Sequence, residues 1–235
     1  MPEDVIDLDA KHVVASARRL RQRVVERFPE ANLGRTAERL ESTAEATVAR
    51  AAELARPNLP LRVAIVLLLV AVALALAWGI YTLQPSETGV ERLDDAVSFF
   101  QATVESLVFV GIGVVFLVTL ERRWKRNRAL DAIHELRVLA HLVDMHTLDK
   151  DPIYVGKGGP TTASSPKRTM SAFELNRYLD YCSEMLSLIG KIAALYGRDM
   201  DDPVALGAVD QVESVTTGLS RKIWQKLMLL DRDVK

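Results

Sequence analysis

Three histidines and an aspartate lie close together in the sequence and could, by residue type, bind a metal ion. They are His134, His141, Asp144 and His146. On a helix, His134 and His141 share a face but lie about 10.5 Å apart along the axis, whereas one ion holds its ligands at about 2 Å. His146 is rotated by about 140° from His141. A shared ion would need ligands from another helix or subunit, so we predict no metal site.

The same segment also resembles a phosphorylation motif. Residues 133–137 read Ile-His-Glu-Leu-Arg, which resembles the short phospho-acceptor box of sensor histidine kinases, and it follows a second apolar segment as the box does in those proteins. The resemblance implies phosphorylation of His134. However, the proline that normally follows the box is absent, and no glycine-rich segment that could hold ATP comes after it. We therefore expect His134 to be an ordinary surface or partly buried histidine.

Patterns typical of catalysis or nucleotide binding are also absent from the sequence. Residues 155–160, Val-Gly-Lys-Gly-Gly-Pro, lack the preceding strand and the Lys-Ser/Thr pair at a helix start that a P-loop requires. No serine, cysteine or carboxylate pair has the partners that catalysis needs. Cys182 lies on an apolar helical stripe and should be an inert core residue. We predict a protein that is not an enzyme and binds no cofactor.

The composition is that of a membrane protein with substantial soluble parts. The 235 residues are 49% hydrophobic and 26% charged. The formal net charge of −1 argues against nucleic acid as a partner, because nucleic-acid-binding domains usually carry a large basic excess. The single cysteine excludes an intrachain disulfide and fits a reducing compartment.

Two apolar segments have the length of membrane-spanning helices. Residues 63–80 contain no charge, and a second apolar block covers residues 106–120. Because about 20 apolar residues cross roughly 30 Å of hydrocarbon, we predict spans at 61–83 and 97–120. The first span begins too late in the chain for a secretory signal peptide, so we expect it to remain in the mature protein.

Charged residues beside the spans predict the topology. Arginines precede the first span, the connecting loop is acidic, and a basic cluster follows the second span. The basic cluster consists of Arg122, Arg123, Lys125, Arg126 and Arg128. By the positive-inside rule, we expect both termini in the cytoplasm of a bacterial-type inner (plasma) membrane. We also expect the basic cluster to contact anionic lipid headgroups.

A few residues within the spans could do more than anchor the chain. Glu105 lies about one turn inside the outer edge of the second span, where it either extends toward the headgroups or, in an oligomer, forms an acidic ring at a pore mouth. Small residues that permit close helix packing occur on both spans. They are Ala71, Ala75 and Gly79 on the first span, and Gly111 and Gly113 on the second.

Local signals predict where several helices begin and end. Residues 88–91, Thr-Gly-Val-Glu, and 171–174, Ser-Ala-Phe-Glu, have the spacing of a capping box, in which a hydroxyl and a carboxylate bind the first free backbone amides. Asp202 before Pro203 is typical of an N-cap followed by the first helical position. No glycine or proline occurs from residue 114 to 149, so we expect the second span to continue as one helix.

We predict an all-α fold: a two-span transmembrane hairpin with a cytoplasmic helical bundle, in which the stalk helix is continuous with the second span. A three-helix bundle would form on the stalk, with an N-terminal helical hairpin docked beside it. The segments, in chain order, are the N-terminal cytoplasmic hairpin (1–56), first transmembrane helix with a proline-flanked entry (57–83), acidic external loop (84–95), second transmembrane helix (96–120), cytoplasmic stalk (121–149), flexible loop (150–170) and C-terminal cytoplasmic helical pair (171–235).

Two functions are compatible with this organisation. Most residues outside the spans are expected in cytoplasmic helices, and the external loop is too short to bind a ligand as a sensor would. We therefore expect a membrane-anchored scaffold or regulatory interaction module that binds an unidentified cytoplasmic protein. The alternative is a small homo-oligomeric channel gated through the stalk.

Overall fold

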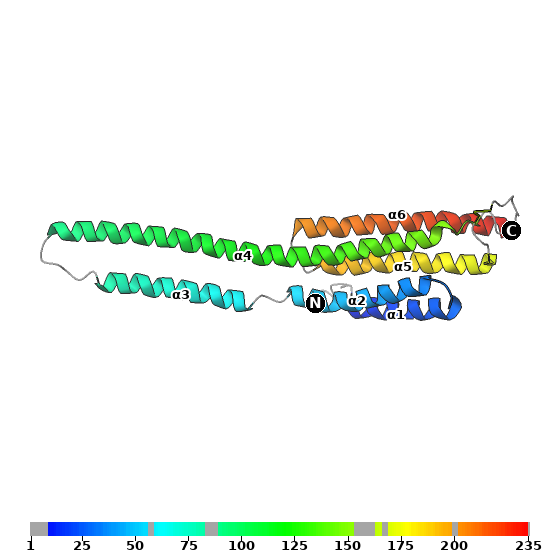
Figure 1. Cartoon of the computed structure of the whole chain (residues 1–235), viewed down its shortest axis with the longest axis horizontal. Helices are drawn as coiled ribbons and strands as arrows, with labels where there is room; N and C mark the ends of the chain where they lie inside the picture. Colours follow the sequence, from blue (N-terminus) through cyan, green and yellow to red (C-terminus); the bar gives the residue numbers. More distant parts are fainter. Residues whose placement is uncertain are drawn as a thin grey trace, which may run out of the picture. The chain divides into compact units, whose positions relative to one another are not determined.

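The computed structural model describes residues 9–55, 59–82, 89–152, 163–165, 169–198 and 202–234. Over these residues it contains six α-helices and no β-strand (Figure 1). The helices are α1 (Ala10–Arg27), α2 (Leu33–Ala55), α3 (Leu59–Thr82), α4 (Gly89–Leu148), α5 (Ala172–Arg198) and α6 (Pro203–Val234). The prediction of an all-α fold is confirmed.

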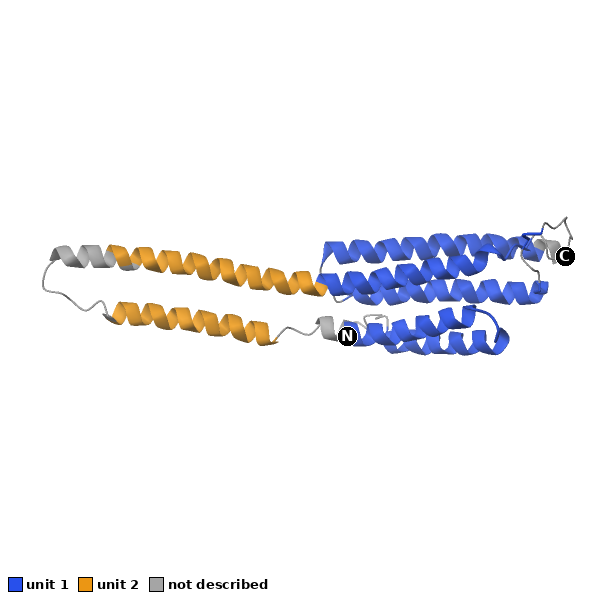
Figure 2. Cartoon of the chain, viewed as in Figure 1, with its two compact units in different colours: residues 1–55, 126–235 blue, residues 56–125 orange. Residues whose placement is uncertain are grey.

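The chain forms two compact units. Unit 1 comprises residues 1–55 and 126–235, and unit 2 comprises residues 56–125 (Figure 2). The boundary falls within α4, which is a single helix of 60 residues. The segments predicted as second span and stalk therefore belong to one helix.

Helix α5 lies at the centre of unit 1. Thirteen of its 27 residues are buried hydrophobics, and they recur three and four positions apart, so the apolar surface of the helix is wide enough to meet several neighbours. It contacts α1, α2 and α6 (Figure 1), and buried residues of α4 join the same core cluster. The α1–α2 hairpin therefore shares this core, whereas the sequence suggested a hairpin attached beside a three-helix bundle.

A buried polar contact joins α2 to α5 within that core. The Tyr196 hydroxyl donates to Thr47 Oγ1 at 3.2 Å, and the Thr47 hydroxyl donates to the Thr43 carbonyl at 2.7 Å. Both hydroxyl groups therefore keep hydrogen-bond partners after they are removed from water, which avoids the cost of an unpaired buried polar group.

The predicted caps of α5 and α6 are confirmed. At the start of α5, the Ser171 hydroxyl accepts from the Glu174 amide at 3.2 Å, and the Glu174 carboxylate accepts from the Ser171 amide at 2.8 Å. At the start of α6, Asp202 Oδ1 accepts from the amides of Val204 and Ala205 at 3.0 and 3.1 Å. The third predicted capping box begins at Thr88, which lies outside the described residues.

Helix α3 and the part of α4 that ends at Lys125 form unit 2. Both are long and apolar enough to cross a membrane, over Leu59–Tyr81 and within Phe100–Leu148, and neither apolar stretch is buried inside the protein. Helix α4 begins at Gly89, so residues 89–95 of the segment predicted as an external loop are helical. The apolar spacing of Leu93, Val97 and Phe100 already continues the pattern of the span, which explains the earlier start.

Candidate interaction surface

The histidines singled out by residue type do not come together. His134 and His141 are exposed, and His146 is half-buried, with its Nε2 atom hydrogen-bonded to the Thr36 hydroxyl at 2.8 Å. Burial, followed by the positive charge of Lys150, lowers the pKa of His146. No group of three or more histidine, cysteine or acidic side chains suited to hold a metal occurs among the described residues.

The single cysteine is a core residue. Cys182 is buried on α5, and burial raises the pKa of its thiol to about 12. Because the thiolate is the reactive form of cysteine, both the burial and the high pKa keep this side chain unreactive in the folded protein.

The basic cluster after the second apolar segment is partly neutralised by acidic side chains. Lys125 Nζ lies 3.1 Å from a carboxylate oxygen of Glu121, and Arg126 Nε lies 3.6 Å from one of Asp202. The side chains of Arg122, Arg123 and Arg128 are exposed. The sequence shows these basic residues as a continuous patch, but only the fold shows that Asp202, 76 residues after Arg126, pairs with one of them.

The residues proposed for pore lining or close helix packing are largely exposed. Glu105, Ala71, Ala75 and Gly111 are exposed, and Gly79 and Gly113 are half-buried. A Cβ atom added at Gly111 or Gly113 would meet no atom within 4 Å. These two glycines therefore make no close packing contact with the described part of the chain.

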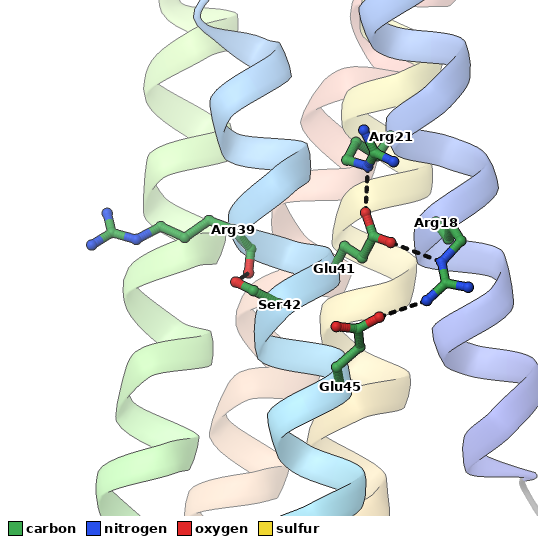
Figure 3. A network of polar contacts seen from close by, with 6 residues as sticks. All are labelled: Arg18, Arg21, Arg39, Glu41, Ser42 and Glu45. Carbon is green, nitrogen blue, oxygen red and sulfur yellow. Dashed lines mark hydrogen bonds and ion pairs between the residues drawn. The ribbon is translucent and has the colours of Figure 1, made fainter.

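Ion pairs fix the orientation of α1 against α2. The Arg18 guanidinium contacts Glu41 at 2.9 Å and Glu45 at 2.7 Å, and Arg21 also contacts Glu41 (Figure 3). These contacts raise the pKa of Arg18. Since Arg18 and Arg21 lie on the side of α1 that faces α2, the arginines at other positions of α1 must point elsewhere.

Those remaining arginines line a groove between α1 and α5, hereafter the arginine groove. One part of it has a volume of about 960 Å³ and includes Arg19, Arg23 and Lys191 in its lining. An adjoining hollow of about 460 Å³ is lined by Arg23, Glu26, Arg27, Arg177 and Tyr181. Arg19, Arg23 and Arg27 are four residues apart, so they lie in a row along one face of α1.

Aromatic side chains of α5 hold three of these arginines in place. The guanidinium carbons of Arg23 and Arg177 lie 5.4 and 5.0 Å from the ring centre of Tyr181, and that of Arg27 lies 5.5 Å from the ring centre of Phe173. Such stacking is a favourable cation–π interaction. Hydrogen bonding to the Tyr181 hydroxyl also raises the pKa of Arg177.

The charges in the arginine groove are incompletely paired. Arg23 pairs with Glu184, and Arg177 pairs with Asp180 at 2.7 Å. Arg19 donates to the Ser16 hydroxyl at 3.2 Å, and within the described ranges neither Arg19 nor Arg27 has an acidic partner. The linings together contain five arginine or lysine side chains and three acidic ones, so the groove carries an excess of positive charge.

The sequence alone does not reveal this groove. The spacing of Arg19, Arg23 and Arg27 is visible in the sequence, but it equally fits a row of solvated arginines on a surface helix. Only the packing of α1 on α5 places Phe173, Arg177 and Tyr181 opposite that row.

Comparison with known proteins gives no relative from which a function can be transferred. No protein-family model matches the sequence, and no curated protein and no solved structure is significantly similar to it.

Proposed function

We propose that this protein is a membrane-anchored scaffold or regulatory interaction module, not an enzyme, and that its helical bundle binds another protein. The observation that carries the proposal is the pairing, in one chain, of two apolar helices with no buried residue in their apolar stretches and a separate, well-packed helical unit. In this proposal the two apolar helices lie in a membrane, whereas the packed helical unit presents a folded surface to water.

The membrane anchor is supported by the side chains that α3 and α4 expose. Large apolar residues such as Leu74, Phe109 and Phe116 are 65, 67 and 64% exposed. Soluble monomers rarely expose large contiguous apolar patches, whereas lipid tails would cover them at no cost. We place α3 and the apolar part of α4 across a bacterial-type plasma membrane, with both termini in the cytoplasm, because the flanking positive charges favour that orientation.

Lipid headgroups complete the anchor. The exposed guanidinium groups of Arg122, Arg123 and Arg128 follow directly after the apolar stretch of α4, where anionic headgroups attract basic side chains. Carbonate washing of isolated membranes and protease treatment of right-side-out spheroplasts test the anchor and its orientation. Release of the chain by carbonate, or cleavage of either terminus from outside, would contradict this part of the proposal.

The partner can be sought with a photo-crosslinking amino acid placed at single exposed positions of the bundle. Gln22 on α1, His141 on α4 and Gln225 on α6 are all exposed, so each replacement should leave the core intact. We expect a reproducible adduct with the same protein from at least one position in living cells. The complete absence of protein adducts from all three positions would count against a scaffold.

A homo-oligomeric channel, gated through the stalk part of α4, is the second candidate, and Glu105 favours it. Glu105 is exposed within the candidate span of α4, and a charge facing lipid is costly unless a second copy or water surrounds it. Exposed small residues, Ala71, Ala75 and Gly111, would allow the copies to approach closely. Conductance in liposomes that is lost in Glu105→Gln would support a channel, and a strictly monomeric protein in mild detergent would exclude it.

A further inference from the structure

The arginine groove is long enough to receive several turns of a helix. Its lining on α1 extends from Asp9 to Arg27, which corresponds to about 27 Å along the helix axis. At its base, Val13 and Leu188 provide apolar contact beneath the charged rim, and they are only 4 and 9% exposed. A polar rim around an apolar base is the usual composition of a protein-binding surface.

Its charges select an acidic occupant. Arg19 and Arg27 lack acidic partners within the described ranges, and Arg27 is held over the ring of Phe173. An arginine that stacking already fixes loses less side-chain entropy when it binds a carboxylate than a free arginine does. Charge-assisted hydrogen bonds of this kind are stronger than those between neutral groups.

The spacing of the arginines favours a helical occupant. Arg19, Arg23 and Arg27 are separated by about 6 Å along α1, and acidic residues four positions apart on a second helix have the same spacing. The helices that form the groove present only side chains to an occupant, because their backbone groups are already hydrogen-bonded. Many backbone amides and carbonyls of an extended peptide would therefore have no hydrogen-bond partner. A helix satisfies these groups internally.

Nucleic acid fits the groove less well. Glu26 and Glu184 line it together with the arginines, and they would repel a continuous row of phosphates. The whole chain also carries a formal net charge of −1. An acidic helix can place single carboxylates opposite the arginines and uncharged residues opposite these two glutamates, so it meets neither problem.

We propose that the arginine groove between α1 and α5 binds an acidic amphipathic helix of a partner protein. This inference rests on the proposed scaffold function and specifies its binding surface and the chemistry of its partner. Arg19 and Arg27 make the decisive contacts, because binding supplies the carboxylates that neither has among the described residues.

A designed pair of fluorescent helical peptides tests the proposal with the full-length protein in mild detergent. One peptide carries glutamates four positions apart with leucines beside them on the same face, and its twin carries lysines in place of the glutamates. We expect the acidic peptide to bind and the lysine twin to bind at least about tenfold more weakly. The double variant Arg19→Glu/Arg27→Glu should lose the acidic peptide and gain affinity for the lysine twin.

The matched control is Arg221→Glu, which reverses an exposed charge on α6 outside the groove. It should leave peptide binding unchanged, and circular dichroism should show that all variants keep their helices. Equal binding of both peptides, or equal binding of the acidic peptide to the double variant and the control, would overturn the proposal. A dimer that dissociates in the double variant would also overturn it, because a second copy would then occupy the groove.

This result is separable from the test of the scaffold itself. Gln22 lines the arginine groove, whereas His141 and Gln225 do not. Crosslinked adducts at His141 or Gln225 but not at Gln22, together with failure of the acidic peptide, would leave the scaffold standing and reject the groove. Adducts at Gln22 that disappear in Arg19→Glu/Arg27→Glu would support both.

Discussion

Replacing Leu186 by alanine should destabilise unit 1 by about 3.5 to 4.5 kcal/mol. Leu186 on α5 is 0% exposed, and the change removes three carbon atoms. Their transfer from water contributes about 0.8 kcal/mol each, and the remaining cavity adds about 1 to 2 kcal/mol because a packed core collapses only partly. The neighbouring exposed Ser187→Ala should change stability by less than about 0.5 kcal/mol.

The same measurement distinguishes a shared core from a separately docked hairpin. Leu40 on α2 is 2% exposed and belongs to the same core cluster, so Leu40→Ala should shift the same unfolding transition as Leu186→Ala, by a similar amount. Urea unfolding in mild detergent, followed by helical circular dichroism, gives both values. A Leu186→Ala effect below about 1 kcal/mol, or a Leu40→Ala effect confined to a separate transition, would refute the shared core.

Three further predictions follow from buried or half-buried groups. The pKa of His146 is lowered in the folded protein, so the unfolded chain binds a proton at this histidine more readily. The free energy of unfolding should therefore be highest above about pH 6.5 and fall at lower pH. In urea unfolding measured across pH, His146→Gln should show a smaller decline. Lys226 Nζ donates to the Thr147 carbonyl near the end of α4. Lys226→Met should therefore lower the free energy of unfolding by about 1 kcal/mol in the same assay. An unchanged urea midpoint of unfolding would show that this hydrogen bond contributes nothing to stability. Cys182 should resist thiol reagents in the folded protein and react once urea unfolds unit 1; rapid labelling without urea would contradict its burial.

Much of the local structure follows directly from the sequence. The apolar composition of residues 63–80 and 106–120 is sufficient to predict two helices that could span a membrane. The caps at Ser171 and Asp202 depend on side chains and amides two or three residues apart, so no distant contact is needed to form them. The absence of glycine and proline after residue 113 likewise allows α4 to continue to Leu148.

Other features depend on contacts between residues far apart in the chain, which no local pattern encodes. The apolar stripe of α5 indicates extensive burial, but its neighbours, including the α1–α2 hairpin, were fixed only by packing. Adjacent arginines on α1 also have different fates: Arg18 pairs with acids of α2, whereas Arg19 faces the groove beside α5. The helical period separates their directions by about 100°, and the sequence determines that separation. The tertiary structure alone decides which direction meets a carboxylate, because the carboxylates come from other helices.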